Sequence, residues 1–222
     1  MKLFKNIKKW LENQEHLFYL FLLILIVPNI ILCFTEPMPV VAKVCNVLLP
    51  FAFYYLLMTL SRNCGKMFWI LFLFIFFGAF QIVLLYLFGQ SIIAVDMFLN
   101  LVTTNSSEAM ELLDNLVPAL VSVIILYIPA LILAVISIIK KRKLSPEFIR
   151  RERKKAWIAL FIGFISLGAA YGLDKRYELK SDLYPANVCY NVALAFQRNA
   201  QTRTYHRTSE NFTFCLLYTS DA

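Results

Sequence analysis

The chain has 222 residues, of which 60% are hydrophobic and only 16% are charged, with a formal net charge of +8. A soluble domain is expected to have about 25% charged residues, so this composition excludes an ordinary soluble globular protein and indicates an integral membrane protein. The positive charge does not indicate nucleic-acid binding, because the basic residues cluster in short segments between apolar stretches. The five cysteines have neither the spacing of a zinc site nor that of a disulfide framework.

The first segment, 1–16, has four lysines and several apolar residues at helical spacing, such as Leu3, Ile7 and Trp10. This pattern predicts a short amphipathic helix on the membrane surface. In a signal peptide, a cleavage site made of small residues would follow the next apolar run, but no such site follows it here. A proline-rich turn at 34–39 follows instead, so we predict an uncleaved membrane span.

Five apolar runs are long enough to cross a bilayer, which requires about 17–25 residues. We therefore expect an all-α membrane protein with five transmembrane helices, separated by short connections except for one longer loop at 89–115. Several prolines lie within the runs, and we expect neighbouring groups to satisfy the carbonyls that they leave without a donor. The predicted spans are about 17–33, 40–60, 67–88, 116–139 and 156–172.

The basic residues predict the orientation of these spans. Segments 1–16, 61–66 and 140–155 carry 4, 2 and 9 basic residues, whereas the loops 34–39 and 89–115 carry none. We therefore place the amino terminus in the cytoplasm and everything after the fifth span on the opposite side. The sequence KKRKLSPEFIRRERKK at 140–155 is interpreted as a topology signal, and contact with anionic lipid head groups is the alternative.

One polar stretch stands out within the loop before the fourth span. Asn100, Thr104 and Glu108 recur every four residues, and each such step turns an α-helix by only about 40°. One stripe would then hold an amide, a hydroxyl and a carboxylate, which suit a zwitterionic head group. Alternatively, Asn105 is the N-cap of a helix and Glu108 its capping glutamate, and the spacing by itself leaves both interpretations open.

Within the fifth span, Gly168 and Gly172 form a small-xxx-small pair. Such a pair is typical of a close helix contact, either in a dimer or with a neighbouring helix of the same chain, and we favour the latter.

Residues 173–214 are mixed, polar and aromatic. Pro185 predicts the first turn of a helix that runs to about Ala200. The apolar residues Val188, Val192, Ala195 and Phe196 fall on one side of this helix, so we expect it to lie along the outer membrane surface.

The last eight residues, CLLYTSDA at 215–222, resemble the read-through translation of a transposase adapter used in sequencing libraries. We interpret them as a sequencing-adapter artefact, and we expect the natural chain to diverge at about Cys215 and to continue into a further domain.

The order of these features, over 1–214, resembles the amino-terminal half of the lipid A phosphoethanolamine transferases, which include the mobile colistin-resistance enzymes. In that family an Asn-x3-Thr-x3-Glu pattern lies between the third and fourth helices, as Asn100, Thr104 and Glu108 do here. The segments YPANVCYNVALAFQR and TSENFTF resemble the family's periplasmic linker. The resemblance implies a bacterial inner-membrane protein with a periplasmic helical loop, a linker at 173–214 and a following sulfatase-like domain.

The resemblance also implies the chemistry. Phosphoethanolamine would pass from phosphatidylethanolamine to lipid A by double displacement on a metal-activated threonine, which would lower the negative charge of lipid A and give polymyxin resistance. The three stripe residues would bind the lipid substrate, the partners would be these membrane lipids and no nucleic acid, and zinc would be bound only in the further domain. The family's Gly-Glu-Thr motif is absent, so we assign no catalytic residue and no metal ligand here and expect this fragment to be inactive.

Two alternatives stay open. One is the anchor of a related sulfatase-fold enzyme, such as a glycerol-phosphate transferase. The other is a small non-enzymatic membrane protein that serves as a structural or transport subunit. Transport is disfavoured because charged residues such as Lys43 occur only near the ends of the spans, whereas an ion path usually needs one within them.

Overall fold

The apolar runs form helices, because a chain in hydrocarbon must satisfy its backbone N–H and C=O groups within the segment. The computed structural model describes residues 10–88 and 106–209, without the side chains of 84–88, 106–116, 181 and 202–209, and these residues contain no strand. The helices are α2 Gln14–Thr35, α3 Val40–Met58, α4 Cys64–Ile70, α5 Phe72–Phe88, α7 Ser106–Ile139, α8 Pro146–Leu173, α9 Leu179–Asp182 and α10 Ala186–Ser209.

Four helices are long and apolar enough to cross a membrane, namely α2, α3, α8 and the part of α7 from Val117 to Ile139. The predicted third span, 67–88, is not one straight helix. It is divided at Leu71 into α4 and α5, which are bent by 62°, and it gives a fifth span only if the pair counts as one. Proline does not cause this bend. Gly65 lets α4 lie directly on α7, where an added Cβ would be 2.4 Å from the carbonyl oxygen of Ala134, so a tertiary contact sets the direction of α4.

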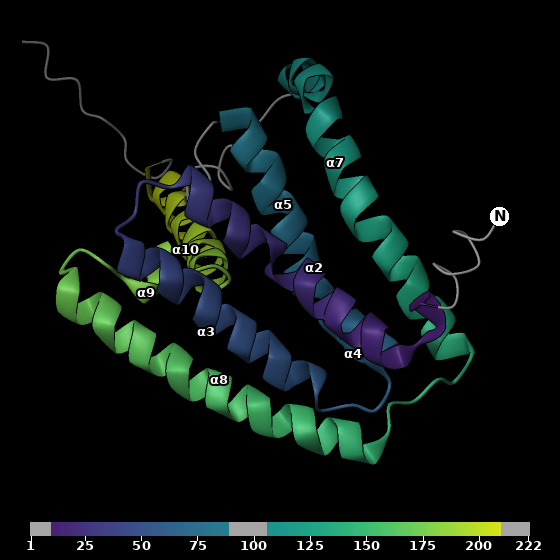
Figure 1. Ribbon diagram of the computed structural model, residues 1–222. Coiled ribbons are helices and arrows are strands. Elements are labelled where there is room, and N and C mark those ends of the chain that lie inside the picture. The colour runs from purple at the N-terminus through teal and green to yellow at the C-terminus, as the bar shows by residue number, and fades with distance from the viewer. Residues whose placement is uncertain (1–9, 89–105, 210–222) are drawn as a thin grey trace, which may run out of the picture.

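The helices are arranged side by side, with α8 at one edge and α7 at the other (Figure 1). Helix α3 packs between α8 and α2, and α5 packs between α2 and α7. Aromatic side chains fill the space between them: the rings of Phe21 and Phe68, for example, stack with their centroids 4.4 Å apart. The main core cluster joins α2, α3, α4, α5, α7 and α8, so each predicted span contributes to one core.

The close contact of α8 is made at a glycine other than the predicted pair. No described residue lies within 4 Å of a Cβ added at Gly168 or Gly172, so the predicted packing of this pair on a neighbouring helix is wrong. Gly163 makes the contact instead, because a Cβ there would be 3.2 Å from the Cα of Leu49 in α3. The small residues of the fifth span therefore predicted that α8 makes a close contact with another helix, but not that the contact lies at Gly163.

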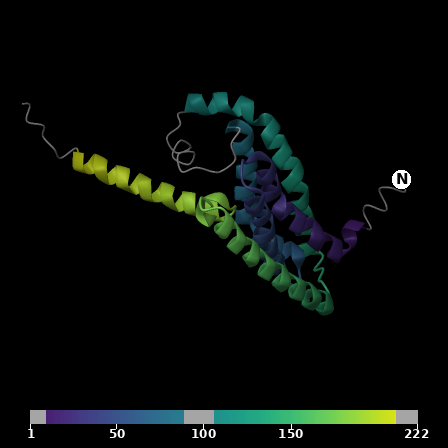
Figure 2. The same ribbon diagram turned by 60° about the vertical axis from the view of Figure 1, so that its left-hand side comes forward.

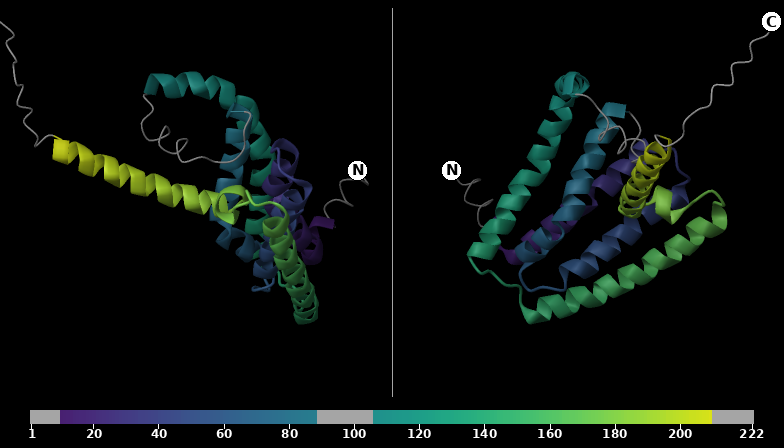
Figure 3. Two further views of the ribbon diagram at one scale, coloured as in Figure 1. Left: turned by 90° about the vertical axis from the view of Figure 1, so that its left-hand side faces the viewer. Right: turned by 180° about the vertical axis from the view of Figure 1, so that it is seen from behind.

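Helix α7 begins with turns that lie across the end of the bundle and then runs along it (Figure 3, left). Pro118 lies within this helix, and an internal proline removes a helical hydrogen bond and allows a bend. The helix ends at Ile139, and Lys141, just beyond it, has a φ of 48°. The N–H of Lys141 bonds to the carbonyl of Ile138 and that of Arg142 to the carbonyl of Ser137, which is the pattern of a Schellman motif.

After α8 the chain turns back into the bundle before it leaves. Helix α10 begins at Ala186, directly after Pro185 as predicted, but it continues to Ser209 and projects away from the other helices (Figure 2). Its predicted apolar side is only partly buried, because Val188 is buried whereas Phe196 is 73% exposed. Only the first part of α10 thus packs against the other helices.

Candidate functional site

The predicted lipid-binding stripe lies mostly outside the described residues. Asn100 and Thr104 are not among them, and Glu108 is in the first turn of α7, which begins at Ser106, without a described side chain. The stripe and the alternative helix cap both stay predictions. The described residues instead contain two other polar clusters, one at each end of the bundle.

The first cluster joins the returning segment 177–184 to α2 and α3, and we call Asn29, Asn46, Tyr177 and Tyr184 the polar junction. The side-chain amide of Asn29 donates a hydrogen bond of 2.8 Å to the carbonyl oxygen of Tyr184. The amide of Asn46 donates one of 2.8 Å to the carbonyl of Asp182 and accepts one of 2.9 Å from the hydroxyl of Tyr177. All four junction residues are buried, so two helices hold the returning backbone by side-chain amides.

Asn29 also satisfies a carbonyl of α3 that has no helical hydrogen-bond donor. Pro50 has no N–H, so the carbonyl of Asn46, four residues earlier, loses its helical donor. The second N–H of the Asn29 amide donates to this carbonyl at 2.9 Å. This contact confirms, for Pro50, the prediction that neighbouring groups satisfy the carbonyls freed by prolines, and it makes one side chain serve both α3 and the returning segment.

Tyr184 enters deeply into the bundle. Its hydroxyl donates a hydrogen bond of 2.6 Å to the carbonyl of Phe74 in α5. Gly78, one turn further along α5, makes room for it: an added Cβ would lie 3.1 Å from the hydroxyl oxygen of Tyr184 and 3.2 Å from that of Tyr127 in α7. A residue beyond the last span therefore reaches the packing between α5 and α7.

Several buried polar atoms near this cluster have no hydrogen-bond partner among the described residues. They include both amide atoms of Gln81, the hydroxyl of Tyr127 and the amide nitrogen of Asn187. Leaving such a group unpaired costs about 1–3 kcal/mol, so these atoms are suited to hold buried water or the polar part of a lipid. They are neutral donors and acceptors, which are chemically suited to hydrogen-bond a polar group but supply no nucleophile.

Some residues of this cluster could have been identified from the sequence. Asn29, Asn46 and Gln81 are side-chain amides within apolar runs, where a polar residue usually has a partner or a function. Tyr177 and Tyr184 had no such signal, because tyrosines are common near membrane interfaces and the segment after the fifth span had no predicted contact with the bundle.

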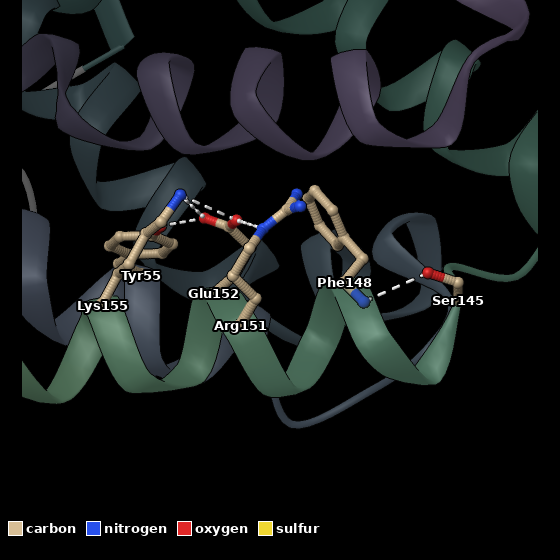
Figure 4. Close-up of polar contacts among 6 residues, drawn as sticks. All are labelled: Tyr55, Ser145, Phe148, Arg151, Glu152 and Lys155. Atoms are coloured by element: carbon tan, nitrogen blue, oxygen red, sulfur yellow. Dashed lines mark hydrogen bonds and ion pairs between the residues drawn. The ribbon is translucent and has the colours of Figure 1, made fainter.

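The second cluster lies at the other end of the bundle, in the charged first turns of α8 before the apolar stretch that starts at Ala156 (Figure 4). The carboxylate of Glu152 is buried and accepts hydrogen bonds from the hydroxyl of Tyr55 in α3, from Arg151 at 2.9 Å and from Lys155 at 3.0 Å. Burial alone would raise the pKa of Glu152, but the hydrogen bonds from Tyr55, Arg151 and Lys155 outweigh it and lower the pKa to about 2. This ionised carboxylate connects α8 to α3.

Within the described part of the chain, no three His, Cys, Asp or Glu side chains come together as a metal site would require. The zinc implied by the resemblance is expected in a further domain, so this finding does not test it. Comparison with protein-family models, with curated proteins and with solved structures finds no match.

Proposed function

We propose that this chain is the membrane-anchoring and lipid-binding part of a phosphoethanolamine transferase that moves phosphoethanolamine from phosphatidylethanolamine to lipid A. The stripe of Asn100, Thr104 and Glu108 and the likeness of its surroundings to that family suggest the substrate. Glu108 would pair with the ethanolamine ammonium, and Asn100 and Thr104 would hydrogen-bond to phosphate or glycerol oxygens.

The polar junction is the structural observation that supports this proposal best. A transferase that takes a head group from the bilayer must keep its catalytic domain at a constant position over the lipid site, because small displacements of reacting groups cost large factors in rate. Asn29 and Asn46 fix the backbone of the returning segment at 2.8 Å hydrogen-bond distances, directly before α10. A domain carried by α10 would therefore start from a rigid attachment rather than from a loose tether.

We place the protein in a bacterial inner membrane, with its amino terminus and the basic segment 140–155 in the cytoplasm. Loop 89–115 and everything after α8 would face the periplasm, where the donor head group and lipid A are modified. The four to five apolar helices of the described residues support a membrane location, and the distribution of basic residues supports the orientation.

The test uses the gene restored to full length and measures phosphoethanolamine on lipid A by mass spectrometry. Glu108→Gln keeps the shape of the side chain and removes its charge. Loss of a charge-assisted hydrogen bond of about 1.5–3 kcal/mol should weaken donor binding roughly 10- to 150-fold. Glu111→Gln, three residues further along α7, is the matched control and should modify lipid A at the parent rate.

Two results would contradict the proposal. If Glu108→Gln accumulates normally and modifies lipid A as fast as the parent, Glu108 is a helix cap and not a donor ligand. If the restored parent adds a group with the mass of glycerol phosphate, the chain belongs to the related transferase instead.

A further inference from the structure

The first turns of α8 present cations next to an exposed apolar surface. Five basic side chains are exposed between Pro146 and Ala156. One turn further, Trp157, Ile158 and Phe161 are 57%, 62% and 68% exposed. The change from cations to apolar side chains within one turn is what a helix shows where it passes from the head groups into the hydrocarbon of a bilayer. The five cations are Arg150, Arg151, Arg153, Lys154 and Lys155.

Protein groups already engage three of these cations. Arg151 and Lys155 are paired with the buried carboxylate of Glu152, and Arg153 donates a hydrogen bond of 2.7 Å to the carbonyl of Thr59. Arg150 and Lys154 have no hydrogen bond or ion pair with any residue that the structure describes. Being four residues apart, they lie one above the other on the same side of α8.

Two open depressions meet at this pair. One has a volume of about 520 Å³ and is lined by Arg150 and Lys154 together with Arg151, Lys155 and Ile158, and also by Pro146 and Glu147. The other, of about 400 Å³, is lined by Arg150 and Lys154 together with Arg62, Arg153 and Trp157. Each depression is thus lined by at least four cations and by a large apolar side chain, Ile158 or Trp157, on the side towards the apolar part of α8, and the first also by the carboxylate of Glu147.

We propose that Arg150 and Lys154 bind the phosphate of an anionic phospholipid in the leaflet on this side of the membrane. The acyl chains of that lipid would lie along Trp157, Ile158 and Phe161. A guanidinium and an ammonium give charge-assisted hydrogen bonds to phosphate oxygens. The apolar end of each depression favours a lipid over a soluble anion or a nucleic acid, because only a lipid extends from phosphate to hydrocarbon. The site is independent of the transferase proposal and lies at the opposite end of the bundle from the polar junction.

Trp157 provides the test, because its indole lines one depression. The purified chain, with Trp10→Phe and Trp69→Phe so that Trp157 is the single reporter, is reconstituted into phosphatidylcholine vesicles. These contain a small fraction of either brominated phosphatidylglycerol or brominated phosphatidylcholine, which quench indole fluorescence on contact. We expect the anionic lipid to quench Trp157 at a several-fold lower mole fraction than the neutral lipid, and salt to reduce this preference.

Arg150→Gln/Lys154→Gln should reduce the preference by about fivefold or more, since each cation near the membrane surface contributes roughly a factor of five to anionic-lipid binding. Both side chains are exposed, so the fold should persist. Lys140→Gln/Lys143→Gln removes the same charge from exposed positions on the same side that line neither depression, and it should keep the preference.

Three results would overturn the proposal. Equal quenching by the two lipids in the parent would show that the pair selects no lipid. Equal losses in the two double variants would show a general effect of charge rather than a site. Displacement of the brominated lipid by a short DNA duplex at equal charge concentration would assign the pair to nucleic acid.

Discussion

Asn29 donates a hydrogen bond of 2.9 Å to the carbonyl of Asn46, the carbonyl that Pro50 leaves without a helical donor. The same amide donates to the carbonyl of Tyr184, which is 155 positions later in the chain. One side chain of α2 therefore completes α3 and also holds the segment that leads to α10.

Replacing Asn29 should loosen both contacts. Asn29→Leu keeps the branched shape of the side chain but leaves two buried carbonyls unpaired, which should lower the free energy of unfolding by about 1–3 kcal/mol. Thermal unfolding of the detergent-solubilised chain, followed by scanning fluorimetry, measures this change. Ser122→Ala, which removes a local hydrogen bond on an exposed part of α7, is the control and should have little effect.

A double-mutant cycle tests whether Asn29 compensates for the N–H that Pro50 lacks. In a Pro50→Ala background the new N–H can serve the carbonyl of Asn46, so Asn29→Leu should destabilise less than it does in the parent. An equal effect in both backgrounds would show that Asn29 does not substitute for the missing helical donor.

Gly78 should not tolerate a methyl group. In Gly78→Ala the Cβ would lie 2.9 Å from the ring of Pro28 and 3.1 Å from the hydroxyl of Tyr184, so either α2 or Tyr184 must shift. We expect a loss of about 1–3 kcal/mol from overpacking, and faster amide hydrogen exchange in the returning segment 177–184. Gly168→Ala adds the same methyl group where none of the residues described in the structure lies within 4 Å, and it should be neutral or stabilising. Equal effects of the two substitutions would contradict the deep position of Tyr184.

Glu152→Gln should weaken the connection between α8 and α3, because Arg151, Lys155 and Tyr55 lose a charged acceptor. A loss of about 1–3 kcal/mol is expected, whereas the exposed Glu147→Gln in the same helix should cost less than about 1 kcal/mol.

The folded pKa of about 2 for Glu152 lies below the ordinary value of 4.5, so the carboxylate stabilises the fold above pH 4.5 and loses this effect as the pH falls towards 2. The difference in melting temperature between parent and variant should shrink over that range; a constant difference would show that the charge is not responsible.

The orientation is tested with a membrane-impermeant thiol reagent on intact cells, in a background with Cys33, Cys189 and Cys215 replaced by serine. Lys175→Cys, at an exposed position beyond α8, should be labelled, and Glu147→Cys, at an exposed position before its apolar stretch, should not. The reverse pattern would invert the proposed topology.

Much of the fold could be predicted from the sequence. The spans at 17–33, 40–60 and 156–172 fall within or almost within α2, α3 and α8, because uninterrupted apolar residues in hydrocarbon must satisfy their backbone locally and only a helix does so. The helix after Pro185 was also predictable from local sequence, since proline favours the start of a helix.

The break at Leu71 and the close contact at Gly163 could not be predicted, because they depend on what lies opposite. Gly65 contacts the backbone of α7 and Gly163 contacts Leu49, whereas Gly168, with the more suggestive spacing, contacts no other helix in the part of the chain that the structure describes. Small residues permit a close approach, but the packing of whole helices decides which of them is used.

The sequence by itself determined the membrane class, the positions of the apolar helices and the uneven distribution of basic residues, since these depend on composition within one segment. Only the tertiary structure decided which groups pair across segments. It brought Asn29 to the carbonyls of Asn46 and Tyr184, and it buried Glu152 against Tyr55 while Arg150 and Lys154 stayed exposed. The physical reason is that a hydrogen bond depends on distance and direction between atoms, and residues far apart in the chain acquire these only when the helices have packed.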